Sequence, residues 1–235
     1  MDFSKAFDKV DHNLLCLKLS SYGIRGEINH WISSFLAGHK QCVVEGEQSN
    51  FVPVESSVPQ GSVLVPYLFL FYINGILDGL HSTCRLFADD TIVYLTVKSS
   101  SDAHQLQNDL TKLADWEQKW SMEFHPDECN VLSITRSKSP IVYNYKLHWH
   151  TLQHFPIVKY LGVTFNSKLT WGEHIGNTTT KANRTLRFLK RNLQVSNPQL
   201  KQQAYRTLVR PLVEYANTIW DPYTKTQVQQ VEMVQ

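Results

Sequence analysis

The sequence predicts an α+β fold, in which short strands and amphipathic helices alternate along a chain of 235 residues. Residues 102–121 repeat apolar side chains at the spacing of one helix face, namely Ala103, Leu106, Leu110, Leu113 and Trp120. Residues 85–95 hold two apolar runs around a pair of aspartates, the pattern of a tight β-hairpin. Hydrophobic residues make up 42% of the chain and aromatic residues 11%, enough for a packed core, which excludes an intrinsically disordered chain.

The first half of the chain is expected to begin with a strand and to continue with helices and hairpins. In order, the elements are a short strand ending at Asp2 and Phe3, helices near 12–21 and 25–37, a hairpin formed by 40–46 and 51–58 around Gly46, and an apolar helix near 66–77. Pro66 suits the first turn of that helix, because proline lacks the N–H that a first turn leaves unpaired. The hairpin at 85–95 follows.

After the helix at 102–121 we expect a strand at 130–135, a hairpin at 143–152 and a strand at 158–165 that contains Gly162. A basic helical region comes next, and its apolar stripe consists of Ala182, Leu186, Leu189 and Leu193. A helix that starts near Pro198 is expected to kink or restart at Pro211, because proline interrupts helical hydrogen bonding. Residues 227–235 are expected to form a last helix that is cut short.

Charge is distributed unevenly along the chain. Residues 1–133 carry 9 Lys and Arg against 17 Asp and Glu, whereas residues 134–210 carry 13 basic residues and one acid, Glu173. An acidic front and a basic rear predict divalent-cation binding at one end and polyanion binding at the other; chance variation of surface charge is the alternative. The longest apolar stretch, 67–77, is too short to span a bilayer, and four widely spaced cysteines argue against a zinc site and a disulfide framework.

Two acidic spots point to metal chemistry: DFSKAFD at residues 2–8 and FADD at residues 87–90. Mg²⁺ prefers oxygen ligands, and two such ions roughly 3.5–4 Å apart clamp the attacking and leaving oxygens of a phosphoryl displacement. An aspartate at a strand end beside an Asp-Asp hairpin tip would supply that kind of site. Taken alone, an Asp-Asp pair in a turn is more often only a turn.

Five motifs occur together in an order that resembles the reverse transcriptases of non-LTR (LINE-type, jockey-like) retrotransposons. They are DFSKAFDKVDH at 2–12, VPQGSVL at 58–64, FADDT at 87–91, the stretch 126–132, and KYLGV at 159–163. Later fragments match as well, among them KANRTL at 181–186 and LVRP at 208–211. The resemblance runs over essentially the whole chain, and the number and order of its motifs make it specific.

The resemblance implies a right-hand polymerase fold. Its parts would be a palm with a split βαβ sheet over residues 1–155, a primer-grip-like strand region at 156–168 and a helical thumb at 169–235. The implied activity is RNA-directed DNA synthesis from deoxynucleoside triphosphates on an RNA template and a DNA primer, in the nucleus or cytoplasm and away from membranes. Measured against the family pattern, the fingers are expected to be missing and the thumb to be truncated.

The resemblance also implies a polymerase active site. Asp2, Asp89 and Asp90 would be the catalytic carboxylates and, with the Phe3 carbonyl, would hold two Mg²⁺ or Mn²⁺ ions. Phe7 would exclude the 2′-OH that distinguishes RNA from DNA precursors. The nucleotide pocket would be completed by Gln60 and Gly61, since glycine lets the backbone approach a ligand closely.

Two further sets of residues are implied to bind nucleic acid. The primer grip would consist of Tyr160, Leu161 and Gly162. The basic stripe of the thumb, which would bind backbone phosphates without reading sequence, consists of Lys181, Arg184, Arg187 and Arg191.

Structural alternatives stand beside these roles. Phe7 is equally a candidate core aromatic, residues 59–61 an ordinary loop, and the basic stripe a solvated helix face. Trp116, Trp120 and Trp149 are expected in the core rather than as base-stacking platforms.

Departures from the family pattern bear on activity. His125 stands where the family has asparagine, and Glu128 where it has a lysine thought to protonate the leaving pyrophosphate. Loss of a general acid typically costs about 10²–10⁴-fold in rate. Ser57 and Val65 each replace a glycine. We therefore expect a weak or inactive polymerase; the alternatives are a non-catalytic nucleic-acid-binding remnant that uses the basic helix, a decayed reading frame without a stable product, and a metal-dependent nuclease.

Overall fold

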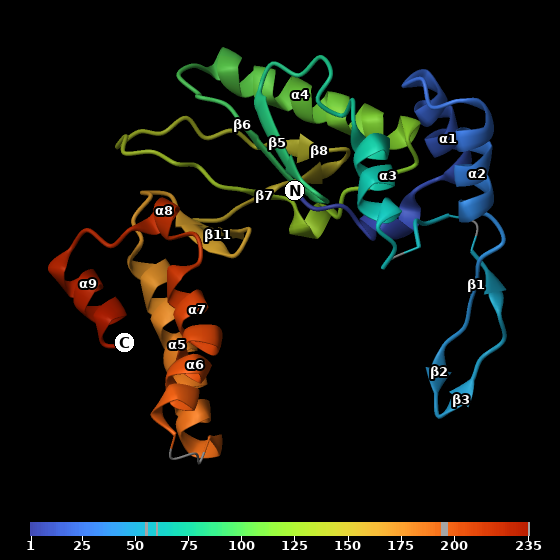
Figure 1. Ribbon diagram of the computed structural model, residues 1–235. Helices are drawn as coiled ribbons and strands as arrows, with labels where there is room; N and C mark the ends of the chain where they lie inside the picture. The colour runs from blue at the N-terminus through green and yellow to red at the C-terminus, as the bar shows by residue number, and fades with distance from the viewer. Residues whose placement is uncertain (55, 60, 194–196, 235) are drawn as a thin grey trace. The chain divides into compact units, whose positions relative to one another are not determined.

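The computed structural model describes residues 1–54, 56–59, 61–193 and 197–234, and shows a mixture of helices and short strands (Figure 1). At this level the expected α+β composition is confirmed. The chain divides into two compact units. The N-terminal unit comprises residues 1–131 and 141–153, and the C-terminal unit comprises residues 132–140 and 154–235. Among the helices of the described residues, none combines the length and the apolar character that crossing a membrane requires.

Two of the helices of the N-terminal unit, α1 and α4, begin at capping side chains. In order they are η1 (Ala6–Lys9), α1 (His12–Ser21), α2 (Gly26–Leu36), α3 (Leu64–Ile73), α4 (Ser100–Lys119) and η2 (Pro126–Glu128). The Asp11 carboxylate accepts the Leu14 N–H at the start of α1. Ser99 and Asp102 form a capping box, so α4 begins two residues before the predicted start.

The first two predicted helices are confirmed to within a residue. The apolar helix is shorter than predicted, because Asn74 leaves the helical conformation and Gly75 follows at a φ of +91°.

All strands of the N-terminal unit are short. Its antiparallel pairs are β1 (Lys40–Gln41) with β4 (Val52–Pro53), β2 (Val44–Glu45) with β3 (Glu47–Gln48), β5 (Thr83–Phe87) with β6 (Asp90–Tyr94), and β8 (Lys146–Leu147) with β9 (His150–Thr151). The predicted hairpin around Gly46 is confirmed, as are the hairpins at 85–95 and 143–152. The predicted strand at 130–135 is reduced to β7 (Asn130–Val131).

The core of the N-terminal unit gathers around α3 and α4, and its largest members include Phe3, Leu15, Leu19, Phe69, Tyr72, Leu113 and Phe124. Lys18 lies within this core: its Nζ donates to the Tyr72 carbonyl at 2.6 Å and sits 3.9 Å from the Trp120 ring centroid. Burial lowers the pKa of Lys18 to about 8.

The tryptophan predictions divide. Trp116 and Trp120 pack against the core, as predicted. The prediction for Trp149 is wrong, because this side chain is 82% exposed. It occupies the turn between β8 and β9, directly after His148 at a φ of 52°, and a two-residue turn leaves no neighbouring layer to cover it.

The C-terminal unit is mostly helical. After β10 (Gln153–His154), at the boundary, come β11 (Ile157–Tyr160), β12 (Val163–Asn166), α5 (Gly172–Asn192), α6 (Pro198–Leu208), α7 (Arg210–Glu214), α8 (Asn217–Trp220) and α9 (Lys225–Glu232). The predicted restart at Pro211 is confirmed: α6 ends at Leu208, and Pro211 lies in the first turn of α7. Of the predicted apolar stripe, Ala182 is buried with Val209 and Val213, and Leu186 and Leu189 pack against them.

The prediction of one strand over 158–165 is wrong. The chain reverses at Leu161 and Gly162, so that β11 and β12 pair as an antiparallel hairpin. Both turn residues have positive φ, 43° and 80°, which is the requirement of a tight hairpin turn whose twist matches its strands. Tyr215 holds this turn: its hydroxyl donates to the Leu161 carbonyl at 2.9 Å, and a Cβ on Gly162 would lie 3.0 Å from its ring.

A buried aspartate fixes the start of β5 to α4. The side chain of Asp109 is 0% exposed and accepts the Ser82 N–H and the Ser82 hydroxyl, each at 2.7 Å, and the His81 N–H at 3.1 Å. Lys112 Nζ lies 3.3 Å from the same carboxylate. Burial raises the pKa of Asp109, but the hydrogen bonds from Ser82, His81 and Lys112 outweigh burial and hold it below its ordinary value of 3.8.

We expect Asp109→Asn to destabilise the N-terminal unit by about 2 kcal/mol at neutral pH, because hydrogen bonds to a buried charge are replaced by weaker ones. A lowered folded-state pKa means that the stabilisation is complete above pH 3.8 and is lost as the pH falls below it. Urea unfolding should therefore show a difference between wild type and variant that shrinks towards low pH. Asp115→Asn, on an exposed position of the same helix, is the control. Equal stability of Asp109→Asn and wild type at pH 7 would contradict this account.

Candidate active site

The first residues of the chain pair with the β5–β6 hairpin. The Met1 nitrogen donates to the Thr91 carbonyl at 2.9 Å, and the Thr91 N–H donates to the Met1 carbonyl at 2.9 Å. Two residues that exchange both hydrogen bonds form one pair of an antiparallel ladder, and a ladder continued in this register would set Asp2 opposite Asp90. Hydrogen-bonded and non-hydrogen-bonded pairs alternate along such a ladder. The two residues of a non-hydrogen-bonded pair have Cα atoms about 4.5 Å apart and side chains on the same face. This register would bring two of the predicted carboxylates together, and the charge of Asp2 does act on Asp90.

The other edge of residues 1–4 pairs with a segment that follows α4. The His125 N–H donates to the Asp2 carbonyl at 2.9 Å, and Phe3 and Phe124 form an antiparallel bridge. Their rings stack with centroids 4.2 Å apart, and both are buried. Because side chains alternate across a strand, Phe3 is anchored in the core while Asp2 lies on the opposite face. The same alternation directs the Phe3 carbonyl towards the side of the hairpin turn.

The turn between β5 and β6 carries the third carboxylate. Phe87 pairs with Asp90, so Ala88 and Asp89 form a two-residue turn, with Ala88 at a φ of 52°. Burial raises the pKa of Asp90, and the negative charges of Asp2 and Asp89 raise it further. Asp2 and Asp89 thus each lie close enough to Asp90 to repel its charge, a repulsion that a bound cation would relieve.

Carboxylate oxygens are the donors that Mg²⁺ prefers, so the chemistry of this donor set fits a hard divalent cation. Within the described ranges, however, no group of three or more His, Cys, Asp or Glu side chains is arranged to hold a metal. His125, the neighbour of Asp2 on the other side, is half-buried, and its Nδ1 has no hydrogen-bond partner in the described part of the chain. The metal ligands remain a prediction.

The predicted nucleotide-pocket residues lie on two segments that touch. The Phe7 carbonyl accepts the Val58 N–H at 3.0 Å, which joins residues 2–8 to the loop at 58–62. The half-buried Phe7 ring packs against Phe69, with centroids 4.4 Å apart. Gly61 has a φ of +95° and open space around its Cα. Gln60 lies outside the described residues.

Two of the noted departures occupy informative positions. Ser57 has a φ of 112°, a backbone region that favours glycine, so the replacement is strained. Val65 is buried in α3, where its side chain contributes to the core rather than to the loop.

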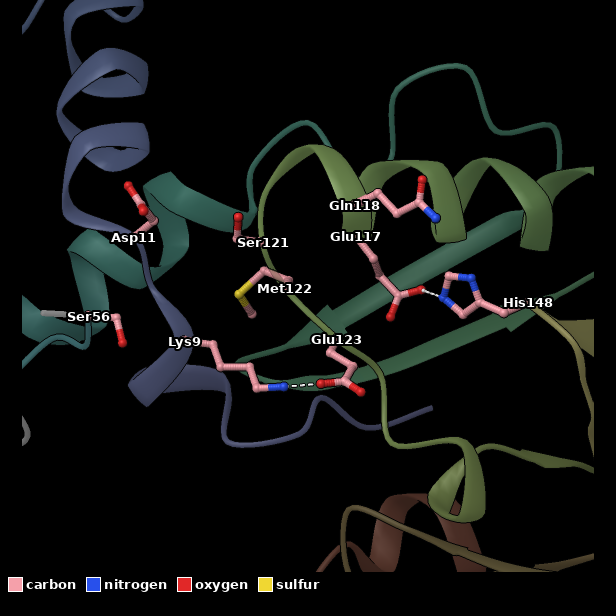
Figure 2. A pocket seen from close by; sticks show the side chains of 9 residues that line it. All are labelled: Lys9, Asp11, Ser56, Glu117, Gln118, Ser121, Met122, Glu123 and His148. Carbon is pink, nitrogen blue, oxygen red and sulfur yellow. Dashed lines mark hydrogen bonds and ion pairs between the residues drawn. The ribbon is translucent and has the colours of Figure 1, made fainter.

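A buried pair supports the segment at 123–125 and was missed by the sequence interpretation. The Glu117 carboxylate, on α4, accepts the Phe124 N–H and lies 2.8 Å from His148 Nε2. Burial raises the pKa of Glu117, and these two partners offset only part of that effect. Figure 2 shows both groups at a pocket of about 530 Å³, together with the ion pair of Lys9 and Glu123. The signal was available: Glu117 falls four residues after Leu113, on the apolar face of α4.

The predicted nucleic-acid-binding residues belong to the C-terminal unit. Tyr160 ends β11, and Leu161 and Gly162 form the turn of the β11–β12 hairpin, which Tyr215 holds. All members of the basic stripe are exposed on α5, and within the described part of the chain none of them forms an ion pair: Lys181, Arg184, Arg187 and Arg191. The stripe lies on the side of α5 opposite Ala182, which is buried.

Comparison with known proteins identifies relatives for the whole chain. A family model described as reverse transcriptase (RNA-dependent DNA polymerase) matches residues 1–165. The chain is 26% identical to the probable RNA-directed DNA polymerase from transposon BS of Drosophila melanogaster. It is 28% identical to the RNA-directed DNA polymerase from mobile element jockey, both of Drosophila melanogaster and of Drosophila funebris.

Each of these alignments covers 100% of the chain but only 27% of the relative, so the chain spans about a quarter of the length of the curated relatives that it matches. The family model covers more than two thirds of the chain and includes both acidic motifs. The resemblance seen in the motifs is thereby confirmed, and the chain belongs to the reverse transcriptase (RNA-dependent DNA polymerase) family.

Proposed function

We propose that the chain is the catalytic part of an RNA-directed DNA polymerase of a non-LTR retrotransposon. The observation that supports this best is the backbone pairing of Met1 with Thr91, whose register would set Asp2 opposite Asp90, next to Asp89 in the hairpin turn. In this proposal residues 1–155 act as the palm, 156–168 as the primer-grip region and 169–235 as the thumb. RNA template, DNA primer and deoxynucleoside triphosphates are the proposed substrates.

In the proposed reaction the primer 3′-oxygen forms a bond to the α-phosphorus of the nucleotide. The bond from that phosphorus to the pyrophosphate oxygen breaks, and the hydroxyl proton leaves to solvent. Two divalent ions, when bound, would neutralise the charge that develops on the phosphate oxygens. Asp2, Asp89 and Asp90 would hold them together with the Phe3 carbonyl.

The neighbouring residues would select and place the nucleotide. The Phe7 ring is fixed against Phe69 and would exclude a 2′-hydroxyl. Gly61 would allow the backbone of the loop at 58–62 to approach the nucleotide, with Gln60 beside it.

A second candidate function is nucleic-acid binding without catalysis. It is favoured by two features: Glu128 is an exposed carboxylate in η2 where the family pattern has lysine, and the basic stripe needs no active site to bind phosphates. In this case binding would weaken with salt and would not depend on Asp89.

Asp89→Asn should reduce primer extension on an RNA template with Mg²⁺ by about 10³-fold or more, because several kcal/mol of transition-state stabilisation depend on the bound ions. Asp89 is half-exposed in a turn, so folding should be retained, which circular dichroism checks. Asp115→Asn is the matched control on an exposed helix position. Extension by Asp89→Asn at the wild-type rate would contradict the proposed active site, and salt-dependent binding without extension by wild type would favour the second candidate.

Glu128→Lys should increase the rate of primer extension by about 10²-fold, because it restores a cationic proton donor where the carboxylate repels the leaving pyrophosphate. The measurement is single-turnover nucleotide addition at saturating deoxynucleotide. Asp127→Lys, the neighbouring exposed acid in η2, makes the same change of charge and should have little effect. Equal gains from both variants would assign the effect to overall charge and not to residue 128.

A further inference from the structure

An exposed aromatic ring interrupts the basic stripe of α5. Phe188 is 56% exposed. It lies four residues after Arg184 and three before Arg191, so the three side chains are neighbours on one helix face. Ala182 is buried on the other side of the helix. More than half of this aromatic side chain is therefore open to solvent on the face that carries the cations.

The charges around the Phe188 ring restrict the kind of ligand that can bind there. Lys181, Arg184 and Arg191 have no acidic partner in the described part of the chain, and the only acid of α5 is Glu173, in its first turn. Neighbouring like charges destabilise a helix, so a face of this kind favours a polyanion. The stripe covers about 15 Å along the helix axis, at 1.5 Å per residue. Cations spaced along one face with an aromatic ring between them match the phosphates and bases of a nucleic-acid strand.

We propose that Phe188 is a stacking platform for an unpaired base, so that α5 binds single-stranded RNA or DNA through the ring and the flanking cations together. This inference rests on the proposed nucleic-acid-binding role of α5 and adds the kind of strand that it binds. A single strand presents the faces of its bases without further cost, whereas in a duplex the ring would have to separate stacked base pairs, which costs a few kcal/mol. The basic stripe would contact phosphates on either side of the stacked base.

The test is fluorescence anisotropy of the full chain with a labelled 12-nucleotide single-stranded RNA and with a blunt RNA–DNA duplex, each over a series of salt concentrations. Phe188→Ala should weaken single-strand binding about 5- to 100-fold, the contribution of one stacked base, with an unchanged salt slope because no charge is removed. Duplex affinity should stay the same. Phe188→Trp should restore single-strand affinity. Tyr223→Ala removes another exposed aromatic residue of this unit, outside α5, and should have no effect.

Arg184→Gln distinguishes the phosphate-binding role of α5 from base stacking on Phe188. Because it removes one phosphate contact, it should lower the salt slope by about 0.7 on a single strand. If Arg184→Gln has this effect and Phe188→Ala binds single strands like wild type, the stacking proposal is wrong while the phosphate-binding role of α5 stands. Equal losses on single strand and duplex in Phe188→Ala would also overturn the proposal, in favour of a ring that wedges between base pairs. If binding does not depend on salt, the proposed role of α5 fails, and the stacking proposal fails with it.

Discussion

The pairing of Met1 with Thr91 is the constraint on which the candidate active site depends. Two backbone hydrogen bonds of 2.9 Å fix the register between residues 1–4 and β6. A shift of this register by one residue would turn Asp2 towards the core and Phe3 out of it, because side chains alternate along a strand. The site is therefore specified by backbone geometry before any side chain contributes.

Buried side chains then stabilise that backbone geometry. The stacked rings of Phe3 and Phe124 anchor the first strand, and Glu117 receives the N–H of Phe124 at its other edge. Asp109 ties the start of β5 to the same helix, α4. Two buried carboxylates of one helix thus support both sides of the strand arrangement. Burying a charge is costly unless it is hydrogen-bonded, and both of these charges are. The carboxylates of the candidate site are in the opposite situation, since the charges of Asp2 and Asp89 add to burial in raising the pKa of Asp90.

Much of this fold could be predicted from the sequence, because its longer elements have strong periodicity and clear ends. The helix α4 and the β5–β6 hairpin are examples: one has five apolar residues at helical spacing, and the other has two apolar runs around Asp89 and Asp90. The hairpin at 157–166 was missed, because its turn residue Leu161 is apolar and reads as part of a continuous strand. Trp149 was misplaced because hydrophobicity alone does not reveal that a residue occupies a turn.

The candidate site, too, could be predicted only in part from the sequence. Motifs identified Asp2, Asp89 and Asp90, but the register that joins them involves residues 1–4 and 123–125, which are too short to show a period. Glu117, Tyr215 and Phe188 act through contacts or exposure that emerge only in the folded chain. The assembly of the carboxylates by strand register is most directly tested by the nuclear Overhauser effect between the Hα atoms of Asp2 and Asp90. The account predicts a strong effect, like that between Leu86 and Thr91 across β5 and β6, because both are pairs without hydrogen bonds. A strong Leu86–Thr91 effect with none between Asp2 and Asp90 would contradict it.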